Sequence, residues 1–217
     1  MPVEMNWHCP ELFPDSTMCI VGGGPSVERA DFRLLGDRPC IGVNSAFRLG
    51  DFVDICVFGD ARWYNLEYGA LRGFKGMVVG LYPFKDKGEI GQTDGVDVKL
   101  MNRSRTSKGI DDNRKNLCWN GSSGGAAVNL AVHLGAKRII LVGFDMRKTD
   151  GRHNFHDIYP WNAHRPDRNP YRIHIKAWPV IAAKAKFKGI KIVNTFRGSA
   201  IKEFEFMKLE EAVERWQ

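Results

Sequence analysis

The chain has 217 residues, of which 43% are hydrophobic and 26% charged, and its formal net charge is +7. This length and composition allow one substantial core, so we expect a single α/β domain over residues 1–217. No window approaches the roughly 18 uninterrupted apolar residues of a membrane span, and the first residues lack a signal-peptide pattern. These features exclude an integral membrane protein and predict a soluble, cytoplasmic one. The positive charge favours an anionic partner.

The first predicted strand, residues 18–21, breaks abruptly into the sequence GGGPS, which comprises Gly22, Gly23, Gly24, Pro25 and Ser26. Glycines permit a tight turn with exposed N–H groups, proline suits a first helical turn, and serine can bond amides there. A strand, a glycine turn and a helix start together form an anion site, because unpaired N–H groups and the helix dipole favour negative charge. The alternative is a plain turn between a strand and a helix.

Two nucleotide-binding motifs are excluded or disfavoured by this stretch. A Walker loop needs Lys followed by Ser or Thr after the last glycine, and neither is present. The dinucleotide fingerprint needs a small residue where Val27 stands and an acidic residue near the position of Asn44. ATPase or GTPase chemistry of the Walker type is therefore not expected, and a nicotinamide enzyme is disfavoured.

Further apolar runs at 40–43, 55–58, 77–81, 138–142 and 191–193 alternate with helical or loop-like stretches. This alternation predicts a Rossmann-like domain, with a mostly parallel sheet, helices on both faces and a lid-like insertion. The carboxyl ends of parallel strands form the edge at which ligands bind. Glycine or polar residues follow five of the strands, and the polar ones include Asn44, Asp60, Asp145 and Asn194.

A second helix start is predicted in the sequence WNGSSGGAAVNLAVHLG, residues 119–135. Ser122 or Ser123 can cap this helix, and Gly124 allows a ligand to approach its first turn closely. The apolar face follows over residues 126–134, and Gly135 ends the helix. We expect this helix start to face the same cleft as the GGGPS turn, although both serines could serve as caps only.

Three other segments carry separate predictions. Residues 102–116 are basic and polar without periodicity, which predicts a surface loop, either solvated or closing over an anion. The C-terminal residues 201–216 are predicted to form an amphipathic helix that packs on the domain or on a second subunit of a homo-oligomer. The five cysteines are odd in number without C-x-x-C spacing, and we expect them to be reduced core residues.

Residues 147–173 combine histidines, aromatic side chains and arginines, and are predicted to form a lid over the strand ends. Aromatic rings stack on sugars, pterins or bases, and arginine pairs with carboxylate or phosphate. The histidines His153, His156 and His164 are candidates for a general base at neutral pH or for surface hydrogen bonding. A metal site formed by His153 and His156 with nearby aspartates is a weaker alternative.

Together the motifs GGGPS, VNSAF, GDARWY, SSGGAAVNLAVHLGAKRIILVGFD and VNTFRGSAIKEF resemble the sialyltransferase-like families. Their relatives include the motility-associated glycosyltransferases, the archaeal hydroxymethylpterin diphosphokinases and many uncharacterised phage and bacterial proteins. The resemblance covers residues 18–204 and rests on the order and spacing of the motifs.

The resemblance implies a role for each matching residue. Residues 22–26 and Asn44 would hold a cytidine nucleotide and its sugar, and Ser122, Ser123 and Gly124 would bind phosphate or carboxylate. Asp145 would contact the nucleotide, and Asp60 would lie near the donor. His164 precedes a helix expected over 173–187, at about the spacing of the relatives' catalytic histidine, and His156 is the second choice. The usual GNGPS is GGGPS here, so one side-chain contact is absent and donor preference is open.

These features lead to the expectation of a glycosyltransferase that moves a sugar from a nucleotide-sugar donor, with a CMP-sugar favoured, to a hydroxyl of an anionic or glycan acceptor. The donor is a substrate, and no cofactor is required. One alternative is an Mg²⁺-dependent diphosphokinase that transfers diphosphate from ATP to a pterin-type alcohol, with Asp60 and Asp145 as metal ligands. Another is a non-catalytic nucleotide or nucleic-acid binder, and a nucleic-acid acceptor would combine the hypotheses.

Overall fold

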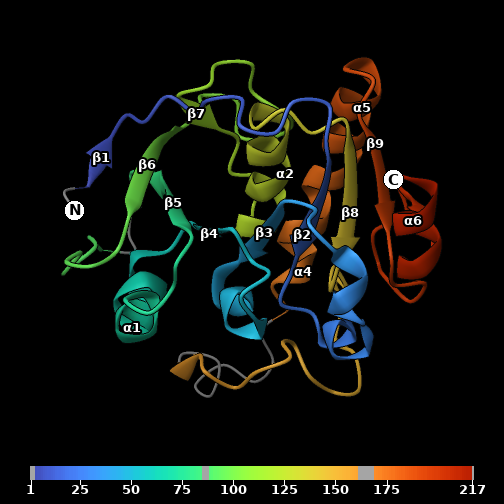
Figure 1. Ribbon diagram of the computed structural model, residues 1–217, viewed down its shortest axis with the longest axis horizontal. Coiled ribbons are helices and arrows are strands. Elements are labelled where there is room, and N and C mark those ends of the chain that lie inside the picture. The colour runs from blue at the N-terminus through green and yellow to red at the C-terminus, as the bar shows by residue number, and fades with distance from the viewer. Residues whose placement is uncertain (1–2, 85–87, 161–168, 217) are drawn as a thin grey trace.

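The computed structural model describes residues 3–84, 88–160 and 169–216, and these form one parallel ten-stranded sheet (Figure 1). The strand order is β1-β6-β5-β4-β3-β2-β8-β9-β10, and β7 pairs with β6. The strands are β1 (Glu4–Met5), β2 (Thr17–Val21), β3 (Cys40–Val43), β4 (Ile55–Phe58), β5 (Met77–Tyr82), β6 (Val98–Arg103), β7 (Asn116–Leu117), β8 (Arg138–Val142), β9 (Lys191–Asn194) and β10 (Glu205–Phe206).

Helices cover both faces of the sheet, as the sequence predicts. One hydrophobic cluster contains side chains of α2 (Ser123–His133) and α5 (Trp178–Phe187), and the other contains side chains of α1 (Ala61–Leu71) and α6 (Leu209–Arg215). The shorter helices are α4 (Tyr171–His174) and the 3-10 helices η1 (Pro25–Arg29), η2 (Phe32–Leu35), η3 (Asn44–Leu49) and η5 (Ile175–Ala177). The predicted α/β fold is confirmed.

The six predicted strands are all present, with small differences in length. β5 and β9 each run one residue further than expected, and β2 begins one residue earlier. β1, β6, β7 and β10 were not predicted. Three of them have two residues, and β6 reads VKLMNR, in which polar side chains interrupt the apolar pattern. The basic segment 102–116 therefore begins inside a strand rather than as a surface loop.

Three predicted helices differ from the structure. The helix expected after the GGGPS turn is the five-residue 3-10 helix η1. The helix expected over 173–187 consists of α4, η5 and α5 in succession. The amphipathic helix expected over 201–216 is shorter, because β10 adds to the sheet before α6 begins. The apolar side of α6 packs on its own domain, with Leu209 and Ala212 buried.

All five cysteines are buried and free of disulfide bonds, as expected. Burial raises the pKa of the Cys9 and Cys19 thiols to about 12, so these thiols are unreactive at neutral pH. No helix within the described ranges is long and apolar enough to cross a membrane. Within the same ranges, no group of three or more His, Cys, Asp or Glu side chains could hold a metal ion.

A buried histidine near the end of α2 makes stability depend on pH. Burial is the main reason that the pKa of His133 lies below 6.5, so the folded state favours the neutral imidazole. Its contribution to stability is full above pH 6.5 and is lost as the pH falls through 6.5 toward the folded-state pKa. We expect His133→Gln to lose less stability than the unmodified protein between about pH 7.5 and about pH 5, measured by urea unfolding.

His8 is exposed, and His8→Gln provides the control. This control should keep the pH dependence of the unmodified protein. If the free energy of unfolding falls equally with pH in His133→Gln and in the unmodified protein, His133 is not the source of this pH dependence.

Candidate functional site

A cavity of about 540 Å³ lies at the carboxyl ends of the strands. It brings together nine of the residues that the sequence selects, contributed by the turns after β2, β3, β4 and β8 and by the start of α2. These are Gly22, Gly23, Gly24, Asn44, Asp60, Ser122, Ser123, Gly124 and Asp145. Pro25, Ser26 and His156 are not among its lining residues, and His164 lies outside the described residues.

The GGGPS turn is bonded to the end of strand β8. The N–H groups of Gly22 and Gly24 donate to the carbonyl oxygens of Val142 (2.8 Å) and Gly143 (2.9 Å). Of the three glycine amides, only that of Gly23 has no acceptor within the described residues. A Cβ on Gly24 would lie 2.3 Å from Asp145 Oδ1 and 2.6 Å from the Gly143 oxygen. The close approach of the β8 turn therefore requires this glycine.

Asp145 positions the GGGPS turn. Its buried carboxylate accepts hydrogen bonds from the Ser26 N–H (3.1 Å), from the Ser26 hydroxyl and from the Thr149 hydroxyl (2.6 Å). The resemblance implies a direct contact of Asp145 with a nucleotide. In the structure both carboxylate oxygens bind protein donors, so Asp145 orients the turn beside the cavity. Ser26 is used in the same contact, instead of capping η1.

Asn44 places an unpartnered polar atom beside the cavity. Its backbone has φ +51°, and its Oδ1 atom is buried without a hydrogen-bond partner in the described part of the chain. A buried acceptor without a donor costs free energy, and residues in this backbone region are common at ligand sites. Asn44 is thus suited to accept a hydrogen bond from a ligand.

The start of α2 provides amide donors. The Ser122 hydroxyl caps the helix by accepting from the Gly125 N–H (3.2 Å), as predicted for one of the two serines. The next two amides, those of Ser123 and Gly124, have no acceptor among the described residues, and both residues line the cavity. Together with the dipole of an eleven-residue helix, these amides can hold phosphate or carboxylate.

The opposite end of the cavity lies beyond strands β4, β5 and β6, and most of its lining residues were not predicted from the sequence. Asp60 lies at this end, caps α1 and forms an ion pair with Arg62 at 2.8 Å. The other lining residues here are Arg62, Trp63, Phe84, Arg103 and Trp119. Arg103 ends a strand that was not predicted, which is why its place at this edge could not be inferred.

The described part of the lid segment lies against the GGGPS turn. The Phe155 N–H donates to the Gly23 oxygen at 3.0 Å, and Arg152 forms an ion pair with Glu28 at 2.6 Å. In Figure 1 this segment passes below the lower end of β8. It contributes His153, Asn154 and Tyr159 to the cavity lining, which supports the expected lid position.

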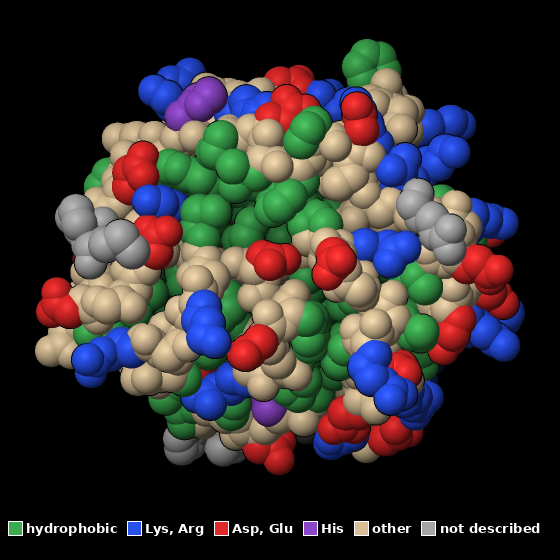
Figure 2. Space-filling view, viewed as in Figure 1, with side chains coloured by type: hydrophobic (Ala, Val, Ile, Leu, Met, Phe, Trp, Pro, Cys, Tyr) green, Lys and Arg blue, Asp and Glu red, His purple; other side chains and the backbone are tan. Residues whose placement is uncertain are grey.

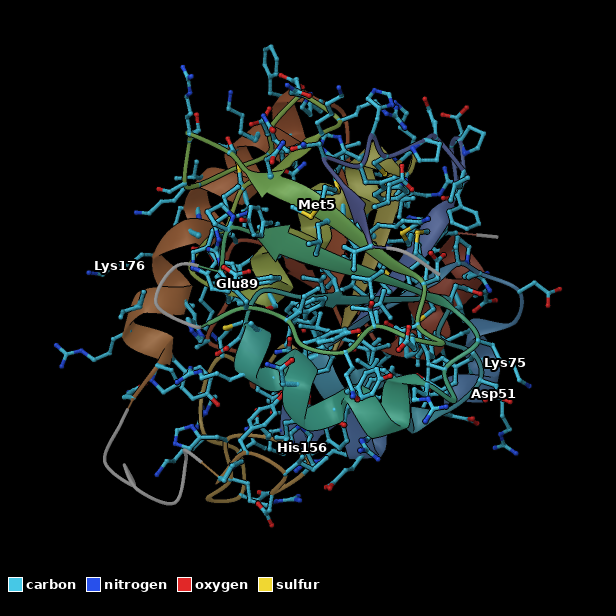
Figure 3. All side chains as sticks on the ribbon, turned by 90° about the vertical axis from the view of Figure 1, so that its left-hand side faces the viewer. Met5, Asp51, Lys75, Glu89, His156 and Lys176 are labelled. Atoms are coloured by element: carbon cyan, nitrogen blue, oxygen red, sulfur yellow. The ribbon has the colours of Figure 1, made fainter. Side chains whose placement is uncertain are left out.

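His156 is packed between aromatic rings and does not line the cavity. Its ring lies 4.6 Å from the ring of Phe155 and 4.6 Å from that of Tyr159, measured between centroids. Figure 3 shows His156 below α1, in the lower part of the molecule. Burial lowers its pKa. The geometry gives this residue a packing role in the lid.

His153 lines the cavity in a defined protonation state. The Tyr171 hydroxyl donates its one hydrogen to the His153 carbonyl oxygen (2.9 Å) and lies 3.2 Å from Nδ1. With the hydroxyl hydrogen used by the carbonyl, this contact favours the tautomer that has its hydrogen on Nδ1, which leaves Nε2 as an acceptor. Burial is the main cause that lowers the pKa of His153, so the ring is neutral at pH 7. His174 also lines the cavity.

Comparisons with known proteins identify the fold. No protein-family model matches the chain, and no curated protein matches it by sequence. Among solved structures, the MAf glycosyltransferase from Magnetospirillum magneticum AMB-1 matches with a TM-score of 0.60 and 14% identity, over 91% of this chain and 34% of that one. The chain thus spans about a third of that protein.

Two sialyltransferases from Campylobacter jejuni match over most of their length. Monofunctional α-2,3-sialyltransferase Cst-I gives a TM-score of 0.58 and 16% identity, over 90% of this chain and 82% of that one. CstII, in complex with the substrate analogue CMP-3FNeuAc, gives a TM-score of 0.52 and 16% identity, over 91% of this chain and 88% of that one. The chain has the fold of these glycosyltransferases. This confirms the resemblance at the level of the fold.

The close approach at Gly24 predicts a position-specific loss of stability. Gly24→Ala should destabilise the protein by about 2 kcal/mol or more, because its methyl group would overlap Asp145 and the Gly143 carbonyl. Gly23→Ala is the matched control, since a Cβ there meets only Asn154 Oδ1 at 3.4 Å. This control should stay within about 0.5 kcal/mol in urea unfolding. Equal losses would refute the structural role of Gly24.

Proposed function

We propose that the protein is a glycosyltransferase whose donor is a nucleotide sugar, with a CMP-sugar favoured, and whose acceptor is a hydroxyl group of a glycan or an anionic molecule. The observation that carries this proposal is a single cavity that joins the GGGPS turn, Asn44 and the first amides of α2. The likeness to glycosyltransferases whose structures contain CMP or a CMP-sugar analogue supports it. The donor is the substrate, and the proposal needs no additional cofactor.

The amides at the start of α2 suit the phosphate of such a donor. Negative charge develops on the leaving phosphate as the glycosidic bond breaks, and preorganised N–H groups stabilise that charge. Ser123 and Gly124 would provide these groups, with the Gly23 amide at the neighbouring turn. Asn44 Oδ1 would accept a hydrogen bond from a hydroxyl or amide N–H of the donor.

A histidine would remove the proton of the acceptor hydroxyl. The resemblance favours His164 for this role. Within the described residues, His153 is the better supported base, because it lines the cavity, is neutral and has Nε2 as an acceptor. We therefore propose these two residues as the candidates for the base.

The alternatives have less support. The carboxylates that would hold Mg²⁺ for diphosphate transfer are already bonded, Asp60 to Arg62 and Asp145 to hydroxyl and amide donors. Nucleic-acid binding favours a continuous basic surface. Figure 2 shows acidic and basic side chains interspersed over the face in view.

Nucleotide binding should depend on the Asn44 side chain. Asn44→Gly keeps the positive-φ backbone accessible and removes the unpartnered oxygen, so stability should change little. Binding of CMP, measured by calorimetry, should weaken about tenfold. Asn6→Gly is the matched control, since Asn6 also has positive φ (54°) and is exposed. Failure of CMP, UDP, GDP and ATP to bind the unmodified protein would refute the proposed function.

The base should affect turnover without affecting nucleotide binding. Replacing the correct histidine, as His164→Ala or His153→Asn, should lower the release of CMP from CMP-N-acetylneuraminate by about 10²-fold or more. Calorimetry with CMP should give an unchanged affinity for the same variant. His8→Asn, at an exposed position, is the control. If both variants retain full turnover, neither histidine is the base.

A further inference from the structure

Arg103 is a half-buried cation that lines the cavity beyond strand β6. Its Nε donates to the Pro83 carbonyl oxygen (2.6 Å), and its Nη2 donates to the Gly59 carbonyl oxygen (3.1 Å). Both acceptors are neutral. No carboxylate in the described ranges lies within ion-pair distance of its guanidinium group, so its charge is not neutralised by a direct partner.

Asp60 is the acidic group that acts on Arg103, and it is already paired. Its carboxylate binds the Arg62 guanidinium at 2.8 Å and the Arg62 N–H at 3.0 Å. Within the described residues, this carboxylate is used by Arg62 and forms no ion pair with Arg103. Burial lowers the pKa of Arg103, and the smaller effect of Asp60 raises it. A partly desolvated charge of this kind favours the binding of an anion.

The guanidinium group is held in one orientation. Two backbone carbonyls fix its edge, and its Cζ atom lies 4.4 Å from the centroid of the Trp119 ring. The Trp119 ring packs directly against Gly59, where an added Cβ would lie 2.1 Å from the Cζ3 atom of the tryptophan. Of the five N–H donors of arginine, two are used by these carbonyls. A planar guanidinium group that is held in one orientation and has unused N–H donors matches the geometry of a carboxylate.

Arg103 lies too far from the GGGPS turn to serve the same group of a ligand. Strands β2 and β6 are separated by β3, β4 and β5, and four strand spacings amount to about 19 Å. The two ends of the cavity can therefore contact different parts of the substrates. If the donor phosphate lies near α2, as the proposed function requires, the β4–β6 end is left for the acceptor.

We propose that Arg103 and Trp119 form an acceptor subsite for a sugar that bears a carboxylate. Arg103 binds the carboxylate, and Trp119 forms the apolar wall beside the sugar ring. This inference rests on the proposed function for the identity of the ligand as an acceptor. The binding preference itself can be measured without any transfer reaction.

The test compares two probes that differ in one group, methyl β-D-glucuronide and methyl β-D-glucoside. Their dissociation constants are measured by ligand-observed NMR titration with and without saturating CMP. We expect the glucuronide to bind about tenfold more tightly, and Arg103→Gln to abolish this preference. Arg105→Gln removes the same charge from an exposed position two residues away and should retain the preference.

Several outcomes would overturn the inference. These are equal binding of the two probes to the unmodified protein, a preference that survives Arg103→Gln, or a preference lost equally in Arg105→Gln. Glucose 6-phosphate is included as a third probe. If it binds more tightly than the glucuronide and this binding requires Arg103, the subsite takes a phosphate and not a carboxylate. Calorimetry with CMP separates the two proposals, because CMP binding without a glucuronide preference refutes only the subsite.

A second measurement applies if Arg103→Gln does not fold. The unmodified protein is treated with phenylglyoxal, which modifies arginine, and the modified residues are located by peptide mass spectrometry. The glucuronide should protect Arg103 but not Arg105, and the glucoside should protect neither. Lack of protection of Arg103 by the glucuronide overturns the proposal.

Discussion

The hydrogen bonds of the Asp145 carboxylate hold together the two turns on which one end of the cavity depends. β2 and β8 are neighbours in the sheet, and Asp145, from the turn after β8, accepts from Ser26, which follows the turn after β2. Burying a carboxylate is costly unless several donors surround it, and here Thr149 adds another. The carboxylate can approach so closely only because Gly24 has no side chain.

The parallel topology determines how the remaining groups are arranged. α2 contacts β2, β3 and β4, so its N-terminus lies over the middle of the carboxyl edge, beside Asn44. Arg103 lies at the β6 end, and the GGGPS turn lies at the β2 end. The cavity thus has amide donors at its centre and, toward one end, the cation of Arg103, which has no directly paired carboxylate among the described residues. Such a distribution suits a pair of substrates that carry two separated negative groups.

The sequence predicted the central strands and their polar ends, because long apolar runs followed by glycine or polar residues are strong local signals. It missed β6, whose pattern VKLMNR is mixed, and therefore also missed Arg103. From the sequence, Trp119 could be placed only shortly before a helix start, because its packing against Gly59 is a long-range contact. The tautomer of His153 depends on Tyr171, eighteen residues away, and no local pattern encodes it.

In the structure, the GGGPS motif has a different role from the one predicted. Its glycines were predicted to expose amides, but the amides of Gly22 and Gly24 bond to the β8 strand and turn, and Ser26 bonds to Asp145. Most donors of this turn are thus used to build the fold, and fewer remain for a ligand. Under the proposed function, α2 then provides most of the phosphate contacts. The turn has a glycine where the families it resembles usually have an asparagine, and Asn44 Oδ1 is a buried acceptor without a partner among the described residues. Under the proposed function, donor selectivity would therefore depend on Asn44 more than on the turn.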